Sequence, residues 1–313
     1  MAGKWRAETR AIVACCMAFL LYAAPIRADE LERNEEPGRS GMPDRPVLGQ
    51  ISYGAMHYPR SNLKSGEGSV RFTKQTVGGG ALFPVADRGR LLINVVHRNY
   101  DYDFGGDSEL GTLLQEGAYG WRLGGLYIGE LTEQWSIFCS AGVRTKVEKG
   151  ASRSDGRMED GLLIFNREMA DTLQLGFGAI ALSRLGKQTL VVPVGTIRWE
   201  MTDRLTLQTM RGLHLIYKLD TAGTWQAGLN GEYQARYVRL NDEGRAPGGV
   251  FRERDLLSTV SLTYEPHPGI RIAAEWGYAV WREISVKDKD DQTVFRSGTD
   301  SGLSASFSAR VAF

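Results

Sequence analysis

Apolar and polar residues alternate along most of the chain from Val47 onward, in runs that are separated by turns. In WQAGLNGEYQARY, for example, Trp225 and Leu229 fall on one face, and Gln226 and Gln234 fall on the other. A period of two residues is that of a β-strand with one apolar and one polar face. Because no helical period of useful length interrupts this pattern, it predicts an all-β domain over residues 47–313.

The length of these runs distinguishes a membrane barrel from a soluble β-sandwich. Sandwich strands usually span about five or six residues, whereas a strand that crosses a bilayer at a tilt needs about nine to eleven. Aromatic residues also gather near the ends of runs, as in an interfacial girdle: Trp135, Trp225, Tyr237, Trp276 and Tyr278. Since only a closed barrel pairs every strand backbone in lipid, we predict a transmembrane antiparallel up-and-down β-barrel.

The number of strands depends on how the segment LTLQTMRGLHLIYKL folds. As a single strand it gives a barrel of about 12 strands, but it points Arg211 at lipid near the middle of the membrane, which costs roughly 2–4 kcal/mol. A hairpin with Arg211 and Gly212 at its tip removes this cost. EDGLLIFNREM then supplies a further strand, and we favour about 14 strands, with 12 as the alternative.

The turns between the runs fall into two classes. ELTEQW, EMTDRL, LDTAGTW and EPHPGI are tight, whereas DYDFGGDSELGTLLQEG, LNDEGRAPGGVFRER and VKDKDDQTVFRSGTD are long and charged. Short periplasmic turns and long outer loops are typical of bacterial outer-membrane barrels. The loop carboxylates could hold Ca²⁺ or bridge lipopolysaccharide phosphates, but without an EF-hand pattern we interpret them as solvated and predict no metal site: Asp101, Asp103, Asp107, Glu109, Asp288, Asp290 and Asp291.

The N-terminal residues have the features of a secretory signal peptide. Basic residues precede the uncharged stretch AIVACCMAFLLYAA, and a small residue, Ala28, precedes the acidic segment DELE. We therefore predict a signal peptide over residues 1–28 and a disordered leader over residues 29–46, which is charged and rich in proline and glycine. After cleavage Cys139 is the one remaining cysteine, so no intrachain disulfide is expected.

The chain ends on GLSASFSARVAF, in which every second residue is apolar. A C-terminal aromatic residue that follows apolar residues at alternate positions resembles the terminal-strand signal of bacterial outer-membrane proteins. This resemblance implies a Gram-negative outer-membrane protein that the barrel-assembly machinery inserts, with an assembly signal at Phe307, Ala309, Val311 and Phe313. To close the barrel, the last strand must pair with the first strand near GQISYGAMHY.

A second resemblance covers the middle of the chain, LGFGAIALSRLGKQTLVVPVGTIRWEMTDRLTL. This segment resembles a group of uncharacterised outer-membrane barrels, which implies no particular activity. Within it, GFGAIA matches a dinucleotide-binding fingerprint, but that motif functions only between a strand and a helix. We interpret its glycines as small residues that permit close packing, and we expect no cofactor. Pro193 falls in mid-strand, where the loss of one backbone donor predicts a bulge or a kink.

The phase of the alternation points a set of charged side chains into the barrel. These lumen-facing candidates are Arg122, Arg144, Lys146, Glu232, Arg236, Arg271, Glu275 and Arg310, beside Gln226, Asn230 and Gln234. In one interpretation they line a cation-rich pore that weakly prefers anions. In the other, the mixed charges pair across the lumen and close it.

No catalytic site is predicted from the four histidines. Barrel phospholipases and lipid A deacylases carry a histidine and a serine two residues apart on one strand face, so that base and nucleophile come within reach. None of the histidines here has a serine in that position, and Ser61 follows His57 only across Pro59. A protease with carboxylates and a histidine at the outer rim remains an alternative.

These observations predict a passive channel for small polar solutes across the outer membrane. The alternatives are a closed structural or surface-interaction barrel and, less favoured, an outer-membrane hydrolase. The expected partners are outer-membrane lipid, lipopolysaccharide and the barrel-assembly machinery. A formal net charge of +1 gives no reason to expect a nucleic-acid partner.

Overall fold

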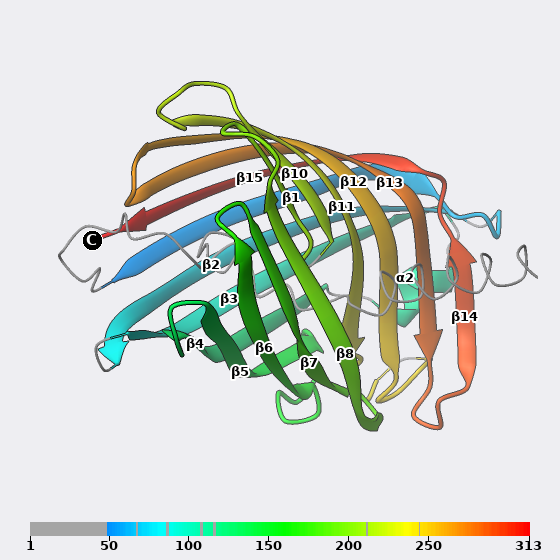
Figure 1. Ribbon diagram of the computed structural model, residues 1–313. Coiled ribbons are helices and arrows are strands. Elements are labelled where there is room, and N and C mark those ends of the chain that lie inside the picture. Colours follow the sequence, from blue (N-terminus) through cyan, green and yellow to red (C-terminus); the bar gives the residue numbers. More distant parts are fainter. Residues whose placement is uncertain are drawn as a thin grey trace, which may run out of the picture.

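A computed structural model shows the chain as a single β-barrel (Figure 1). It describes residues 49–66, 68–85, 88–106, 109–114, 117–210, 212–243 and 245–313. The predicted signal peptide and leader lie outside these residues. No helix in the described ranges is both long and apolar enough to cross a membrane.

The strands follow one another around the barrel in chain order, and neighbouring strands of the ring are antiparallel. They are β1 (Gln50–Asn62), β2 (Ser69–Val85), β3 (Gly89–Gly105), β4 (Ala118–Glu130), β5 (Trp135–Glu148), β6 (Arg157–Ala170), β7 (Leu173–Arg184), β8 (Lys187–Glu200), β9 (Leu205–Gln208), β10 (Leu213–Lys218), β11 (Trp225–Arg239), β12 (Val250–His267), β13 (Ile270–Lys287), β14 (Thr293–Gly298) and β15 (Gly302–Ala312). A short helix, α2 (Glu109–Leu113), follows β3.

The last strand closes the barrel on the first, as predicted. Ile51 pairs with Val311 and His57 with Ala305, in an unbroken antiparallel register. β14 and β15 both pair with β13, one beyond the other, and thus form a single interrupted strand. The barrel therefore has 14 strands, which confirms the favoured prediction.

The segment that decided the strand count folds as the predicted hairpin. β9 and β10 pair from His214 opposite Gln208 to Tyr217 opposite Leu205. Gly212 lies close against β11, where a Cβ atom would approach the carbonyl oxygen of Gly231 to 2.3 Å. Arg211, the residue whose cost in lipid motivated the hairpin, lies outside the described residues.

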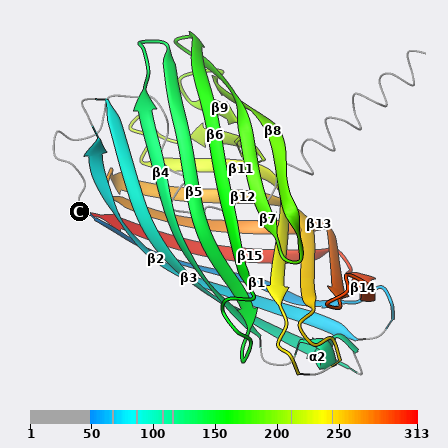
Figure 2. The same ribbon diagram turned by 90° about the horizontal axis from the view of Figure 1, so that it is seen from below.

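The two ends of the barrel differ. The connections at 131–134, 171–172, 201–204, 219–224 and 268–269 lie at the end where the chain terminates, which we call the turn end. The opposite end, the loop end, carries α2 and the 240–249 segment (Figure 2). The long loops are shorter than predicted, because Asp101 and Asp103 lie in β3, residues 250–254 begin β12, and residues 293–298 form β14.

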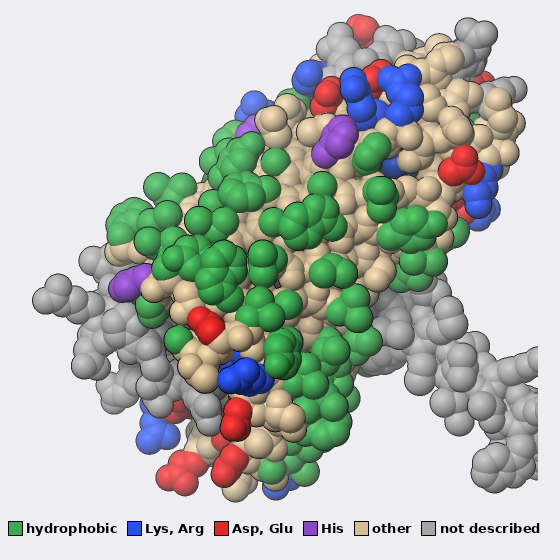
Figure 3. Space-filling view, turned by 90° about the horizontal axis from the view of Figure 1, so that it is seen from above, with side chains coloured by type: hydrophobic (Ala, Val, Ile, Leu, Met, Phe, Trp, Pro, Cys, Tyr) green, Lys and Arg blue, Asp and Glu red, His purple; other side chains and the backbone are tan. Residues whose placement is uncertain are grey.

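The outer face of the barrel carries the apolar rows of the alternation. Val77, Leu123, Phe177, Val260 and Trp276 are all exposed on this surface. Figure 3 shows hydrophobic side chains spread across one such face, with charged side chains gathered towards its ends. A continuous apolar exterior on a closed barrel is the surface that meets lipid, and it agrees with the predicted transmembrane fold.

The glycines of GFGAIA permit a close approach between β7 and β6. A Cβ atom at Gly178 would lie 1.8 Å from the carbonyl oxygen of Leu163, whereas at Gly195, in β8, the nearest heavy atom would be 3.8 Å away. We expect Gly178→Ala to lower the free energy of unfolding by about 1–3 kcal/mol, because the backbone of β6 must shift. Gly195→Ala is the matched control and should change it little in a urea titration; equal losses from both variants would contradict the packing argument.

Pro193 lies in β8 without the bulge that we predicted. Pro193 pairs with Ala179 in an unbroken register, and the irregularity between β7 and β8 falls between Leu182 and Arg184. On its other side, β8 pairs with β9 only over residues 198–200. Pro193 thus lies in a part of β8 that has one partner strand, and such an edge tolerates a residue that has no backbone donor. The pairing therefore contradicts the bulge, and the kink, which was its alternative, stays a prediction.

Candidate functional site

The two sides of the barrel interior differ in character. Strands β11 to β15, with β1 and β2, present a polar wall whose buried members include Ser52, Thr76, Thr259, Thr263 and Ser304. Strands β3 to β8 also bury polar side chains, such as Ser140, Asn166 and Thr196, but they carry in addition one packed apolar cluster, which we call the apolar wall. The apolar wall consists of Leu92, Leu126, Phe138, Leu162, Ile164, Ile180, Leu182 and Val194.

The apolar wall corrects the expectation that the inner face is uniformly polar. Phe138 is an apolar residue at a position of the polar, inward phase of WSIFCSAGVRTKV, and the structure places its side chain at 1% exposure within this cluster. The sequence signal that could have revealed the wall is the presence of runs that are apolar at consecutive positions, LLIF in β6, AIAL in β7 and LVVPV in β8. Such runs are typical of strands with two apolar faces.

A second apolar cluster fills the loop end of the barrel. Its largest fully buried side chains are those of Tyr58, Phe72, Leu110, Leu114 and Phe251. Leu110 and Leu114 belong to α2 and the residue that follows it, so this loop packs inward. We call this cluster the plug, because it occupies the interior where a pore would have to open to the outside.

The barrel is also narrowed at the loop end by contact between two strands that are distant around the ring. Arg239 at the end of β11 forms a parallel bridge with Val147 at the end of β5. The backbone N–H of Asn241 donates to Glu148 Oε2 at 2.9 Å. The ends of β5 and β11 are therefore adjacent, although β6 to β10 separate them at the turn end.

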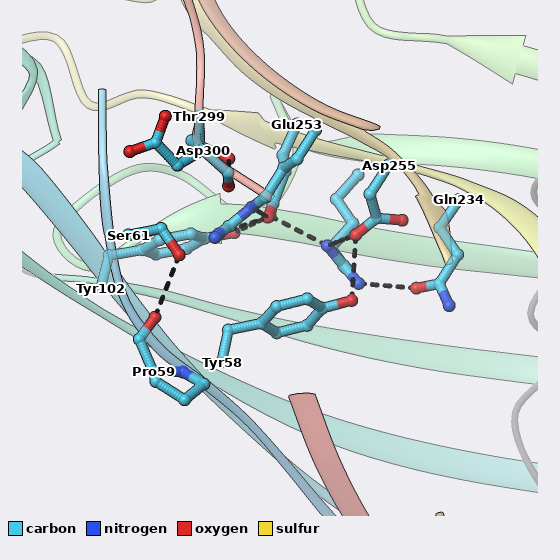
Figure 4. A network of polar contacts seen from close by, with 11 residues as sticks. Tyr58, Pro59, Ser61, Tyr102, Gln234, Glu253, Asp255, Thr299 and Asp300 are labelled. Atoms are coloured by element: carbon cyan, nitrogen blue, oxygen red, sulfur yellow. Dashed lines mark hydrogen bonds and ion pairs between the residues drawn. The ribbon is translucent and has the colours of Figure 1, made fainter. Parts of the chain in front are cut away.

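A network of buried charges lies beside the plug (Figure 4). Arg236 Nη1 lies 3.1 Å from Glu253 Oε2 and 2.9 Å from Asp255 Oδ2. Arg282 Nε donates to Glu253 Oε1 at 2.7 Å. Each of these four side chains is at most 7% exposed. Two guanidinium groups thus balance two carboxylates in the interior, as a buried ionic network requires.

Neutral groups complete this network. Tyr58 donates to Asp255 Oδ2 at 3.2 Å, and Tyr102 donates to Glu253 Oε2 at 3.0 Å. Arg236 Nη2 donates to Gln234 Oε1 at 2.6 Å, and its guanidinium carbon lies 5.0 Å from the centre of the Phe72 ring. The carboxylates therefore accept hydrogen bonds as well as ion pairs, and the aromatic rings join the network to the plug.

Three basic candidates lie on the other side of the interior. Arg122 Nη2 lies 3.2 Å from Asp160 Oδ2, with both side chains almost fully buried. Arg144 Nε lies 3.7 Å from Asp160 Oδ1. Lys146 Nζ lies 3.7 Å above the ring centre of Tyr100. These cations are each opposed by a carboxylate or an aromatic face, which is the closed-lumen arrangement.

The other candidates lie along the polar wall. Glu232 and Glu275 are buried, and Glu275 Oε2 accepts a hydrogen bond from Ser306 at 3.0 Å. Arg271 pairs with Glu265 at 3.0 Å near the turn end. Arg310, which is partly buried, lies opposite Arg271 in the pairing of β13 with β15.

Sequence reasoning missed most of the central network. Glu253, Asp255 and Arg282 were not among the candidates, nor were Tyr58 and Tyr102. VFRER had been assigned to a loop, although residues 251, 253, 255 and 257 continue one inward phase of β12. Extending the alternation through that segment would have placed both carboxylates inside the barrel.

Two of the histidines and Ser61 form hydrogen bonds with nearby side chains or carbonyl groups. His57 shares a hydrogen bond of 3.1 Å with the Thr73 hydroxyl, and His214 one of 2.9 Å with Asn230. The Ser61 hydroxyl donates to the carbonyl oxygen of Pro59 at 3.4 Å (Figure 4).

Several of the carboxylates considered as metal ligands have basic or backbone partners, and Asp107 lies outside the described residues. Asp103 pairs with Arg60 at 2.6 Å and with Arg71 at 2.7 Å. Asp291 lies 2.9 Å from both Lys187 and Lys287, and hydrogen bonds from these two lysines lower its pKa. The ion pair with Lys187 connects the β13–β14 turn to the beginning of β8. Within the described residues no cluster of metal-ligating side chains is present.

Solved outer-membrane barrels align with most of the chain. The COG4313 outer membrane channel from Pseudomonas putida F1 is 9% identical, covers 89% of this chain and 100% of that chain, and gives a TM-score of 0.49. The P. putida toluene transporter TodX is 9% identical, with coverages of 86% and 91% and a TM-score of 0.41. The KdgM porin is 9% identical, with coverages of 84% and 99% and a TM-score of 0.34. Likeness at this level concerns the barrel fold alone.

Sequence comparison adds a family to this likeness in fold. The family described as Domain of unknown function (DUF6268) matches residues 50–313, which are the residues from the start of β1 to the C-terminus. No curated protein matches the chain.

Proposed function

We propose that the chain, which belongs to the family described as Domain of unknown function (DUF6268), is an outer-membrane channel for small polar solutes whose loop end is closed by the plug. The observation that supports this proposal most directly is the polar wall. Along β11, Gln226, Asn230 and Gln234 point inward at successive levels from the turn end to the charge network. Polar groups that line one side of a lumen can replace part of the water around a passing solute.

The plug sets the condition under which such a channel conducts. Leu110 and Leu114 insert from the α2 loop and are at most 1% exposed. They come from a short connection and not from the barrel wall, so their displacement leaves the strand pairing intact. We therefore interpret the described conformation as the closed state of the channel, with the α2 loop as its movable part.

Single-channel recording tests this proposal. We expect the Leu110→Ser/Leu114→Ser variant to show discrete conductance steps in a planar bilayer at least ten times as often as the wild type, because polar substitutions remove the apolar contacts that hold the α2 loop in the plug. Thr112→Ala, on the exposed side of the same helix, is the matched control and should behave like the wild type.

A closed barrel without transport is the second candidate, and the packed plug is the observation that favours it. If neither the wild type nor the double leucine variant conducts at high voltage and high salt, the channel proposal fails. The protein would then be better explained as a structural or surface-interaction barrel. A heat-dependent mobility shift on SDS gels verifies that each variant is folded before its recording is interpreted.

A further inference from the structure

The barrel wall between β8 and β11 is incompletely paired in the part of the chain that the structure describes. β9 pairs with β8 over residues 198–200, and Thr209 bonds to Ile197 just beyond. β10 pairs with β11 over residues 226–231. Nearer the loop end than these pairs, residues 187–196 of β8 and 233–238 of β11 each have one backbone edge with which no described β-strand pairs. We call these two edges the seam.

The seam lies at the depth of the apolar belt. From Val191 to Ile197 the outward positions of β8 are apolar or glycine, with Val191 at 63% exposure and Ile197 at 40%, whereas Lys187 and Thr189 occupy the outward positions nearer the loop end. Open strand edges do not occur against lipid, because their N–H and C=O groups have no partner there; at membrane depth such backbone is found where it lines an internal space. Pro193, in the middle of the β8 edge, removes one of these donors.

The apolar wall extends to the seam. Its members on β3, β4 and β5 are each at 1% exposure, whereas Ile180, Leu182 and Val194, on β7 and β8, are at 6–8%. Met210, in the tip of the β9–β10 hairpin, packs against the same cluster. The side chains of the wall on β7 and β8, beside the seam, are thus more exposed than those on β3 to β5. Met210 borders them there, and its flexible thioether side chain adapts readily to different neighbours.

The apolar wall and the plug are separate clusters, and the bridge between Arg239 and Val147 ends the β11 edge of the seam, because β12 occupies the other side of Arg239. The beginning of β8 is held by the ion pair between Lys187 and Asp291, whose side chains are 40% and 50% exposed. An exposed ion pair is a weak restraint. Because no plug member lies on β8 in the described residues, a displacement of this edge would leave the contacts within the plug intact.

From these features we propose that the seam is a lateral port, through which small uncharged apolar molecules with alkyl character pass between the surrounding lipid and the apolar wall. This port is distinct in route and in substrate from the axial channel for polar solutes. It does not depend on whether the axial route conducts, because the apolar wall and the plug are separate clusters, although Val238, in the β11 edge of the seam, belongs to the plug.

Cysteine labelling in liposomes tests the port. In a Cys139→Ala background, the Val194→Cys variant carries a thiol on the apolar wall beside the seam. The matched control is Ser304→Cys, a similarly buried inward position on β15, which pairs with Gly277 of β13 and directly follows in sequence the end of the pairing between β15 and β1 at Ala305. We expect pyrene maleimide dissolved in the lipid to label the Val194→Cys variant at least tenfold faster than the Ser304→Cys variant. A sulfonated, membrane-impermeant maleimide should not show this preference.

The substrate class is tested in the same assay. Decane added to the liposomes should slow labelling of the Val194→Cys variant at least threefold by occupying the apolar wall, whereas glucose should leave it unchanged. Equal rates at both cysteines, or faster labelling at Val194→Cys by the water-soluble reagent, would overturn the port. The absence of any effect of decane would overturn its assignment to apolar molecules.

A second copy of the chain could also cover the seam, and the labelling experiment would then give a different result. Strand pairing between two copies would protect the Val194→Cys thiol from the lipid-dissolved reagent and would give a dimer in chemical cross-linking. Protection together with a dimer would contradict the port. A monomer that is labelled from the lipid supports it. Failure of the planar-bilayer recordings alone would leave these results unaffected, so the two proposals are separately testable.

Discussion

Replacing Arg236 by methionine is expected to lower the free energy of unfolding by about 3–5 kcal/mol, because it leaves buried carboxylates without their partner. Asp255 would keep only the hydrogen bond from Tyr58, and Glu253 would keep Arg282 and Tyr102. Methionine retains an unbranched stem that can continue to pack against Phe72. The measurement is the urea dependence of unfolding in liposomes, followed by the loss of the heat-modifiable band.

A charge-balanced double variant is the control for this prediction. Arg236→Met combined with Asp255→Asn restores equal numbers of buried positive and negative charges, because Arg282 then opposes Glu253 alone. We expect the double variant to recover at least half of the lost stability. A double variant less stable than Arg236→Met would show that shape, and not charge balance, governs this part of the interior.

Replacing Phe313 by serine is expected to reduce the amount of folded protein in the outer membrane several-fold. The Phe313 side chain is 70% exposed, so it contributes little to interior packing. Its backbone exchanges hydrogen bonds with Gly49 at 2.9 and 3.0 Å, and its ring covers that glycine closely. The substitution retains these backbone bonds. An effect on insertion would therefore reflect loss of an aromatic end group that the assembly machinery recognises, as the resemblance of the last strand implies.

Two comparisons isolate the assembly effect. Phe313→Tyr keeps the aromatic ring and should reach the outer membrane in normal amounts. Purified Phe313→Ser protein, refolded into liposomes without any machinery, should regain the same heat-modifiable band as the wild type. Normal insertion of Phe313→Ser in cells would refute the proposed role of the terminal residue, and failure to refold in liposomes would assign its effect to stability.

The strand pattern could be predicted because each residue in a barrel strand faces either lipid or the interior. The alternation in WQAGLNGEYQARY is reproduced by β11, in which Leu229 is exposed and Gln234 is buried. The cost of Arg211 in lipid was sufficient to predict the β9–β10 hairpin and hence the 14-stranded barrel. The pairing of the last strand with the first followed from the need to leave no open edge.

The contents of the interior could not be predicted in the same way. Alternation identifies the inward face of a strand only when one of its two faces is polar. In the strands that carry Phe138, Leu162 and Val194 both faces are largely apolar, so the pattern does not show that these side chains point inward. The partners of Arg236 are on β12, and they meet it because the register of β11 and β12 brings Arg236 opposite Glu253. Tyr58 and Tyr102 reach the same carboxylates from β1 and β3, across the barrel.

The sequence by itself determined the all-β class, the outward apolar rows, the hairpin at Gly212 and the closure of β15 on β1, because each of these follows from the environment of single residues. Only the tertiary structure decided that the loop end is filled by the plug, that β5 meets β11 at Val147, and that Pro193 lies on an open edge beside the apolar wall. These features depend on which strands come together across the ring, and that is set by the registers and unequal lengths of all the strands jointly.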